Sequence, residues 1–191
     1  MRLFVALDLP EEVRHEFREL IARLKKECPA ARWVRPEGIH VTLKFIGERE
    51  DIDMGSIREA LAPVRSEQAV EMEFRGLGFF PDARRPRVVW CGVEASANLA
   101  ALAGEVAGAL EALGIERETR EYTPHLTLAR LEPGKISAGE MRKLVLAAES
   151  LEGESFGTAR AGGFYLFESI LKPAGAEYRK LQAFPFVRGI A

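Results

Sequence analysis

Hydrophobic and polar positions alternate with a period of two in several parts of the chain. Apolar residues occupy every second position in five segments: 2–9, 39–47, 69–80, 87–94 and 124–131. Alternation of this kind is typical of β-strands that bury one face. The pattern therefore predicts five half-buried strands.

Between these strands, apolar residues recur at helical spacing. Proline suits the first turn of a helix, serine favours the N-cap, a serine followed three residues later by glutamate forms a capping box, and glycine commonly ends a helix. On these signals we predict helices between Pro10 and Pro29, over 52–64, from a Ser96 cap to Gly114, and after the pair Ser137 and Glu140.

The C-terminal part returns to strand-like segments. The stretch 153–169 is apolar but contains several glycines, which predicts one long or bulged strand. The segment YRKLQAF (178–184) then predicts an edge strand. Strands and helices together indicate an α+β protein.

The order of the elements repeats along the chain. Arg2 and Arg87 open corresponding strands and lie 85 positions apart, as do His40 and His125. A fixed offset between similar elements is the mark of an internal duplication. We therefore predict a single domain over 1–191 with two lobes, about 2–80 and 86–168, related by a pseudo-twofold axis.

Each predicted repeat contains the pattern His-x-Thr-Leu, in IHVTLKF and in PHLTLAR. Residues i and i+2 of a strand face the same side, so His40 lies beside Thr42, and His125 beside Thr127. The intervening leucine and valine positions face the core. With pseudo-twofold symmetry, the two imidazole–hydroxyl pairs are expected to meet in one cleft.

Two imidazoles and two hydroxyls suit phosphodiester chemistry. Imidazole titrates near neutral pH, so that one ring can act as base while the other acts as acid. Hydroxyl groups can donate hydrogen bonds to phosphate oxygens, and in-line displacement needs groups on opposite sides of the phosphorus. Activity with a bell-shaped pH profile and no response to chelator is expected.

Other interpretations of the motif remain open at this point. A single His-x-Thr on a strand is most often structural, because threonine is a good strand former; the second copy at an equivalent position favours function. A zinc site is the rival, but catalytic zinc normally has three protein ligands and the motif offers two histidines. The third histidine, His15, is expected on the surface of the first helix.

The segments HVTLKFIGE and HLTLAR, with the opening MRLFVALDLPEEV, closely resemble the 2H phosphoesterase superfamily. Together with WVRPEGIHVTLKFIGE, they resemble more narrowly the bacterial and archaeal RNA 2′,3′-cyclic phosphodiesterases, also called 2′-5′ RNA ligases. The resemblance covers nearly the whole chain. It implies a bilobal α+β fold, a pseudo-twofold duplication with two antiparallel sheets lining a central cleft and helices outside.

The resemblance also implies a reaction and its residues. A terminal 2′,3′-cyclic phosphate would be opened to a 2′-phosphate without metal or other cofactor, with 2′-5′ ligation as the possible reverse. His40 would donate a proton to the leaving oxygen, His125 would accept one from water, and Thr42 and Thr127 would bind the phosphate. The residues alone do not distinguish donor from acceptor, since two close histidines titrate as a pair.

Residues around the motif have two interpretations each. Arg130 is either a phosphate clamp or a solvated strand end. Lys44 shares the face of His40 and Thr42 on a regular strand, so it either charges the cleft or leans outward. Phe79 and Phe80, in a predicted loop, either stack on a base or cover the core edge, and we favour the latter. The basic segment 82–87 either guides RNA or is solvated.

Composition narrows the expected binding partners and cellular compartment. A net charge of −2 argues against a protein that coats nucleic acid along its length, though not against one that binds a strand end. Cys28 and Cys91 form no metal-ligand pattern and are expected to be reduced thiols. No apolar run is long enough to cross a bilayer. We expect a cytoplasmic monomer whose partners are RNA 3′ ends with a cyclic phosphate, tRNA fragments included, and no membrane.

Two further functions stay open. The same chemistry would serve a small cyclic nucleotide or an ADP-ribose cyclic phosphate. A non-catalytic module that binds RNA ends is the alternative of a different class, but binding alone needs arginine and lysine rather than paired histidines. No Walker loop or GxGxxG pattern occurs in the chain.

Overall fold

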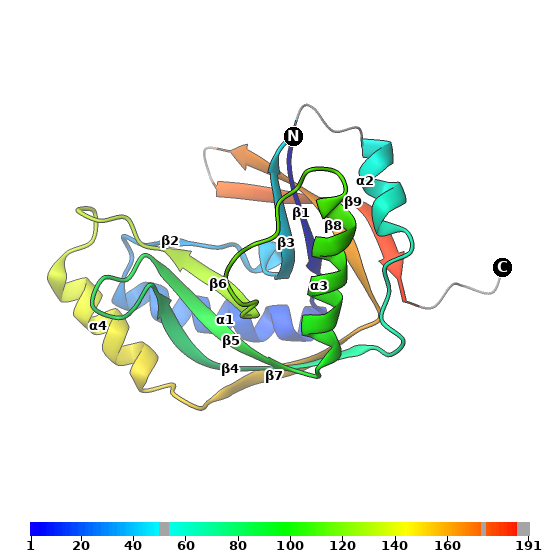
Figure 1. Cartoon of the computed structure of the whole chain (residues 1–191). Helices are drawn as coiled ribbons and strands as arrows, with labels where there is room; N and C mark the ends of the chain where they lie inside the picture. The colour runs from blue at the N-terminus through cyan, green and yellow to red at the C-terminus, as the bar shows by residue number, and fades with distance from the viewer. Residues whose placement is uncertain (50–53, 173–174, 187–191) are drawn as a thin grey trace.

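The computed structural model describes residues 1–49, 54–172 and 175–186, and its elements are shown in Figure 1. In chain order they are β1 (Arg2–Leu7), α1 (Glu11–Glu27), β2 (Arg32–Trp33), the 3₁₀ turn η1 (Pro36–Gly38), β3 (Val41–Glu48), α2 (Met54–Leu61), β4 (Val70–Phe80), β5 (Val88–Ala95), α3 (Asn98–Glu111), β6 (His125–Arg130), α4 (Ala138–Glu149), β7 (Ser155–Ala161), β8 (Gly163–Lys172) and β9 (Gly175–Pro185). The predicted α+β class is confirmed.

Two antiparallel sheets form the framework. The first sheet has the strand order β3-β1-β8-β9, and the second has the order β2-β6-β5-β4-β7. Each sheet therefore draws strands from both halves of the chain, since β4 pairs with β5 and β8 pairs with β1. The internal duplication itself stays a prediction.

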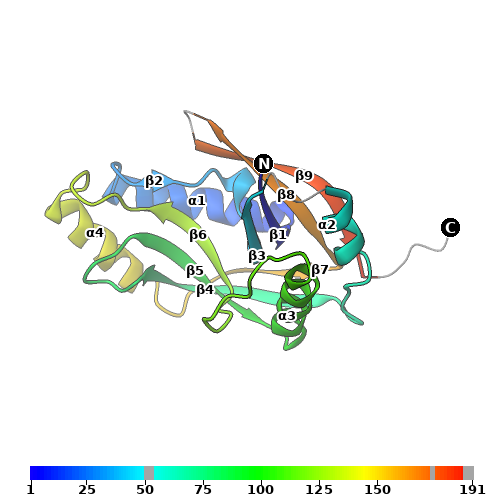
Figure 2. The same ribbon diagram turned by 45° about the horizontal axis from the view of Figure 1, so that its top comes forward.

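Helices cover the sheets in two pairs. Helices α1 and α4 pack together, with α1 against β7 and α4 against β4 of the second sheet. Helices α2 and α3 pack together, and α3 lies against β3 of the first sheet (Figure 2). Helix α1 buries the apolar face that its spacing predicts: Val13, Phe17, Leu20, Ile21 and Leu24.

The predicted single strand over 153–169 is wrong. The chain leaves the second sheet at Ala161, the end of β7, and enters the first sheet at Gly163, the start of β8. A Cβ atom at Gly163 would lie 2.7 Å from the carbonyl oxygen of Phe184, so glycine allows β9 to approach. Apolar alternation continues across the junction because both strands bury one face, and it therefore hides the change of sheet.

Of the two predicted serine caps, the structure contains one. The capping box of Ser137 and Glu140 is present at α4. Ser96 does not cap α3, since its hydroxyl accepts the backbone N–H of Glu71 and Ala97 occupies the N-cap position. Of the helix predicted over 52–64, residues 54–61 form α2, and 52–53 lie outside the described residues.

Both cysteines are free thiols, as expected, and both are buried. Within the described ranges, none of the helices has the length and apolar character needed to span a membrane.

Candidate active site

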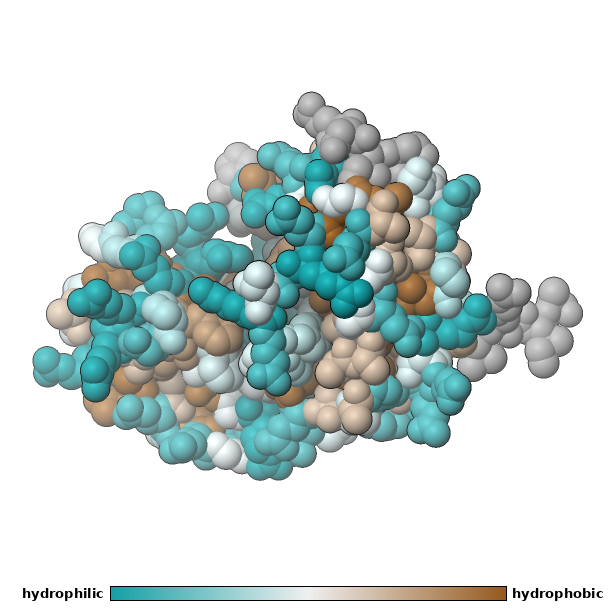
Figure 3. Space-filling view, in the orientation of Figure 1, coloured by the Kyte–Doolittle hydropathy of each residue, from teal (hydrophilic) through white to brown (hydrophobic). Residues whose placement is uncertain are grey.

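The two His-x-Thr segments lie on facing walls of a cleft between the sheets. His40 directly precedes β3 of the first sheet, and His125 opens β6 of the second. Together with Thr42 and Thr127 they line a cleft of about 630 Å³. In the space-filling view, a hollow bordered by polar side chains separates the regions of the two sheets (Figure 3). All four motif residues therefore face one space.

Local burial explains this arrangement. Val41, Leu43, Leu126 and Leu128 are buried in the main core. The two histidines and two threonines that alternate with them along the strands are only half-buried. Strand alternation therefore anchors each motif by its apolar positions and directs its polar positions to the cleft.

Both imidazole rings are oriented by a backbone carbonyl two residues earlier. Nδ1 of His40 lies 2.7 Å from the carbonyl oxygen of Gly38, and Nδ1 of His125 lies 2.8 Å from that of Thr123. A carbonyl oxygen only accepts, so Nδ1 carries the proton and donates. In the neutral ring, Nε2 then has the free lone pair. Each histidine thus has Nε2 as its reactive atom.

Aromatic side chains surround His40. Phe4 of β1 stacks on its ring with 4.5 Å between centroids, and Tyr178 of β9 meets it edge to face at 5.0 Å. Burial lowers the pKa of His40 to about 4, although its bond to the Gly38 carbonyl acts in the opposite direction. The positive charge of Arg14 lowers this pKa further. His40 is therefore neutral at pH 7 in the free protein.

An aromatic side chain also meets His125. Phe80 packs edge to face on its ring, with 5.0 Å between centroids and 82° between planes, and lies 5.1 Å from Trp90. Phe79 and Phe80 end β4 instead of forming the predicted loop. Phe79 packs against the core, as favoured from the sequence, but Phe80 contacts a candidate catalytic residue.

A register shift brings Arg130 into the cleft. Trp90 pairs with Thr127 and Val89 pairs with Ala129, so Leu128 is an extra residue in β6. A bulge of this kind resets the alternation. Arg130, five positions after His125, would face away from it on a regular strand, yet it lines the cleft.

The same shift occurs in β3 and removes Lys44 from the cleft. Ala6 pairs with Thr42 and Val5 pairs with Lys44, which leaves Leu43 as the extra residue. Lys44 is only 5% exposed, and its Nζ donates to the carbonyl oxygen of Glu116 at 2.8 Å. The expectation that Lys44 shares the face of His40 is wrong, because the bulge turns it to the opposite side.

Arg14 of α1 organises the segment before His40. Its Nη1 donates to the carbonyl oxygens of Pro36, Glu37 and Ile39 at 3.0, 2.7 and 3.3 Å. Its Nη2 also pairs with Asp8, and the side chain is 12% exposed. These bonds hold the turn whose Gly38 carbonyl orients the imidazole.

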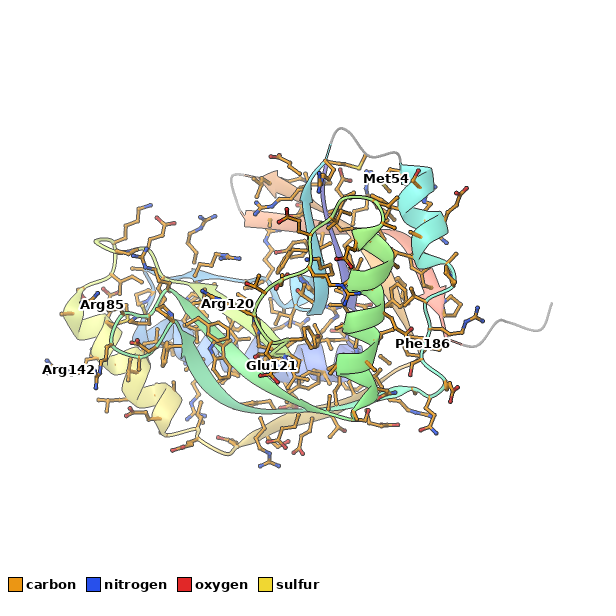
Figure 4. The ribbon with its side chains drawn as sticks, in the orientation of Figure 1. Met54, Arg85, Arg120, Glu121, Arg142 and Phe186 are labelled. Carbon is orange, nitrogen blue, oxygen red and sulfur yellow. The ribbon has the colours of Figure 1, made fainter. Side chains whose placement is uncertain are left out.

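The loop between α3 and β6 connects the two walls. It carries Arg120 and Glu121, labelled in Figure 4, and next to them Tyr122. The hydroxyl of Tyr122 donates to the carbonyl oxygen of Thr42 at 2.9 Å. The strand that follows this loop starts with His125, so one segment is bonded to the first motif and leads into the second.

Sequence patterns missed several residues of the cleft. Arg2 and Phe4 lie on the face of β1 opposite to that of Leu3, Val5 and Leu7, and this alternation was a signal for their side. Phe45 lines the cleft and is 57% exposed, an unusual position for a large aromatic residue. Tyr178 reaches the site only through the pairing of β9 with β8, which nothing near it in the sequence indicates.

Other candidates lie outside the cleft. The basic segment 82–87 provides none of the described residues that line it, and the backbone N–H groups of Arg84 and Arg85 bond to Asp82. His15 is exposed on α1, as predicted. Across the described ranges, no group of three or more His, Cys, Asp or Glu side chains is placed to hold a metal ion.

Comparison with known proteins identifies relatives over the full length. The family model described as LigT like Phosphoesterase matches residues 7–90 and 92–178. A protein of Archaeoglobus fulgidus named RNA 2′,3′-cyclic phosphodiesterase is 35% identical over 184 residues, covering 96% of this chain and 99% of that protein. A protein of Thermotoga maritima with the same name is 32% identical over 191 residues, covering 100% and 98%.

Solved structures share the fold. The crystal structure of a Thermus thermophilus protein matches with a TM-score of 0.76 and 28% identity, covering 97% of this chain and 98% of that one. The structure of E. coli LigT in complex with 3′-AMP matches with a TM-score of 0.74 and 24% identity, covering 98% of both chains. At this identity the second match supports the fold alone.

Proposed function

Because this chain belongs to the LigT-like phosphoesterase family, we propose that it hydrolyses the 2′,3′-cyclic phosphate at the 3′ end of RNA to a 2′-phosphate. The relatives named RNA 2′,3′-cyclic phosphodiesterase support the substrate class. The observation that carries the chemistry is the paired orientation of His40 and His125, whose Nδ1 atoms are both occupied by carbonyl oxygens, which leaves both Nε2 atoms for proton transfer.

The reaction follows from these groups. Nε2 of His125 takes a proton from water, whose oxygen attacks the phosphorus. The bond from phosphorus to the 3′-oxygen breaks, and that oxygen receives a proton from Nε2 of His40. Thr42, Thr127 and Arg130 bind the phosphate oxygens, and charge-assisted bonds from Arg130 strengthen as negative charge develops. Water and the cyclic diester become a 3′-hydroxyl and a 2′-phosphate, and neither metal nor cofactor enters.

The lowered pKa of His40 requires one further step. A donor must be protonated, and the free ring with a pKa of about 4 is mostly neutral at pH 7. Binding of an anionic cyclic phosphate beside the ring favours its charged form and raises this pKa. The bound substrate therefore favours the protonated form of His40, which is the form that can donate a proton. In 2′-5′ ligation, the 5′-hydroxyl of a second strand would attack the phosphorus in place of water, and the same bond to the 3′-oxygen would break.

Product analysis tests the function. A short RNA ending in a 2′,3′-cyclic phosphate is incubated with protein in the presence of EDTA, and His40→Ala, His125→Ala and the surface control His15→Ala are compared. We expect a 2′-phosphate product, with each active-site variant slower by about a hundredfold or more. Binding without turnover would instead support the RNA-end binding module, and turnover of only mononucleotides would support the small-nucleotide enzyme.

A sulfur substitution separates acid from base. In a substrate whose 3′-oxygen is replaced by sulfur, the leaving thiolate needs no proton. His40→Ala should regain most of its lost activity on this substrate, and His125→Ala should not. The opposite pattern would exchange the two roles.

A further inference from the structure

A row of three polar side chains crosses the first sheet beside the candidate active site. Arg2 of β1 pairs with Ser169 of β8, and Ser169 pairs with Tyr178 of β9. Directly paired residues of adjacent strands project from the same face with their Cβ atoms about 5 Å apart. All three line the cleft. The row therefore presents one guanidinium group and two hydroxyl groups to the same space.

The charge of Arg2 is not neutralised. No hydrogen bond or ion pair joins the side chain of Arg2 to any described residue, although Glu48 is its cross-strand neighbour on β3. Two other cations of the cleft do have partners, because Arg32 pairs with Glu132 and Lys172 pairs with Glu177. The described residues that line the cleft include no aspartate or glutamate. A free guanidinium group in such a place is suited to an anion.

The row lies next to His40, because one of its members, Tyr178, contacts the imidazole ring. Phe4, which stacks on His40, is two residues from Arg2 on the same face of β1, about 6.6 Å along the strand. Tyr178 contacts both Phe4 and His40 and belongs to the row itself. The row is therefore close enough to His40 to bind a second phosphate of the same substrate.

We propose that Arg2, Ser169 and Tyr178 bind a second phosphate of the substrate, the 5′-phosphate of the terminal nucleotide whose cyclic phosphate lies between His40 and His125. The inference rests on the proposed function and deepens it. A nucleoside 2′,3′-cyclic phosphate lacks this group, whereas every RNA end longer than one nucleotide contains it. The row thus makes the protein select strand ends over mononucleotides.

The electrostatics of Tyr178 agree with this assignment. Burial raises the pKa of its phenol, and the positive charges of Arg130 and Arg2 act in the opposite direction. Both guanidinium groups therefore lie close enough to influence this hydroxyl. A protonated phenol and a serine hydroxyl donate hydrogen bonds, which an anionic phosphate accepts.

Two small substrates test the proposal. Adenosine 2′,3′-cyclic phosphate is compared with the same compound carrying a 5′-phosphate, and kcat/KM is measured for both on each protein preparation. The ratio of the two values does not depend on the fraction of folded protein. For the wild type we expect a preference for the 5′-phosphorylated substrate of about tenfold to a hundredfold, the range for hydrogen bonds to a charged group.

Variants locate the source of the preference. In Arg2→Ala the ratio should fall close to one. Tyr178→Phe, which keeps the ring against His40 and removes only the hydroxyl, should lower the ratio by several-fold. The matched control is Arg142→Ala, since Arg142 is exposed and projects outward from α4 (Figure 4). This variant loses the same charge and should keep the wild-type ratio.

The outcomes are distinct. A wild-type ratio near one, or an Arg2→Ala ratio equal to that of the wild type, overturns the second-phosphate site and leaves the phosphodiesterase function intact. Equal loss of the ratio in Arg2→Ala and Arg142→Ala would indicate a general charge effect and also overturn it. If the protein hydrolyses neither compound and no short RNA, the proposed function is overturned, and the inference falls with it.

Discussion

The ring of Phe4 stacks on the ring of His40, with 4.5 Å between their centroids and 29° between their planes. This contact covers one face of the imidazole, and Tyr178 meets the ring in an edge-to-face contact. Phe4 of β1 and Tyr178 of β9 therefore contribute to the burial that lowers the pKa of His40.

The free protein should contain one histidine with an unusually low pKa. In an NMR titration of the three imidazoles, we expect His40 to titrate near pH 4, because its charged form is excluded from water. Phe4→Ala should raise the pKa of His40 toward the ordinary value of 6.5 by hydrating the ring. An unchanged pKa in this variant would show that stacking on Phe4 is not the cause.

Acidification should destabilise the fold through the same residue. Because the folded state keeps His40 neutral, protons bind preferentially to the unfolded chain between its pKa of 6.5 and the folded value of about 4. The free energy of unfolding should fall as the pH is lowered through this window, by at most about 3 kcal/mol from this residue.

Urea denaturation at several pH values measures this effect. In His40→Gln the dependence of unfolding free energy on pH should be weaker than in the wild type between pH 6.5 and 4. In the exposed-histidine control His15→Gln it should match the wild type. Parallel curves for wild type and His40→Gln would contradict the prediction.

Arg14 should act as a positioning residue. Arg14→Lys keeps the charge but loses the guanidinium fork that bonds Pro36, Glu37 and Ile39. We expect kcat to fall about tenfold to a hundredfold, because small displacements of a catalytic group are costly. KM should change little. The measurement is steady-state hydrolysis of a cyclic-phosphate RNA.

A second arginine on α1 provides the control for this variant. Arg18 makes only exposed ion pairs, with Glu11 and Glu37, so Arg18→Lys should retain the wild-type kcat. Melting curves of both variants show whether they are folded. A kcat for Arg14→Lys within twofold of the wild type would show that these bonds do not position His40.

Two glycine substitutions should change stability in opposite directions. A Cβ atom at Gly78 would lie 2.1 Å from the ring of Trp90, so Gly78→Ala should destabilise the protein by about 1–3 kcal/mol. At Gly104, exposed within α3, the added atom meets nothing within 4 Å. Gly104→Ala should stabilise by up to about 1 kcal/mol. Thermal melting of both variants checks the signs, and a stable Gly78→Ala would show that Trp90 can move aside.

Alternation along the sequence was sufficient to predict most strands and the common face of each His-x-Thr pair. It was insufficient for Lys44 and Arg130, because each lies just beyond an extra residue in its strand. A bulge depends on the register with a neighbouring strand, and no local pattern encodes it. Similar bulges therefore have opposite effects: the bulge in β3 removes a cation from the cleft, and the bulge in β6 adds one.

Other features could not be predicted because they depend on pairing between strands far apart in the sequence. The segment 153–169 alternates throughout, but β7 and β8 belong to different sheets. Tyr178 contacts His40 only because β9 pairs with β8. Contacts of this kind depend on how distant strands assemble, which the periodicity of one segment does not contain.

The exchange of strands between the halves has a consequence for a divided chain. A cut in the loop between β4 and β5 would yield two fragments, and each would hold only part of both sheets. His125 would lose Phe80, and His40 would lose Tyr178, to the other fragment. Neither piece alone would hold a complete site, so catalytic turnover by a mixture of the two would report their reassembly, as in a split reporter enzyme.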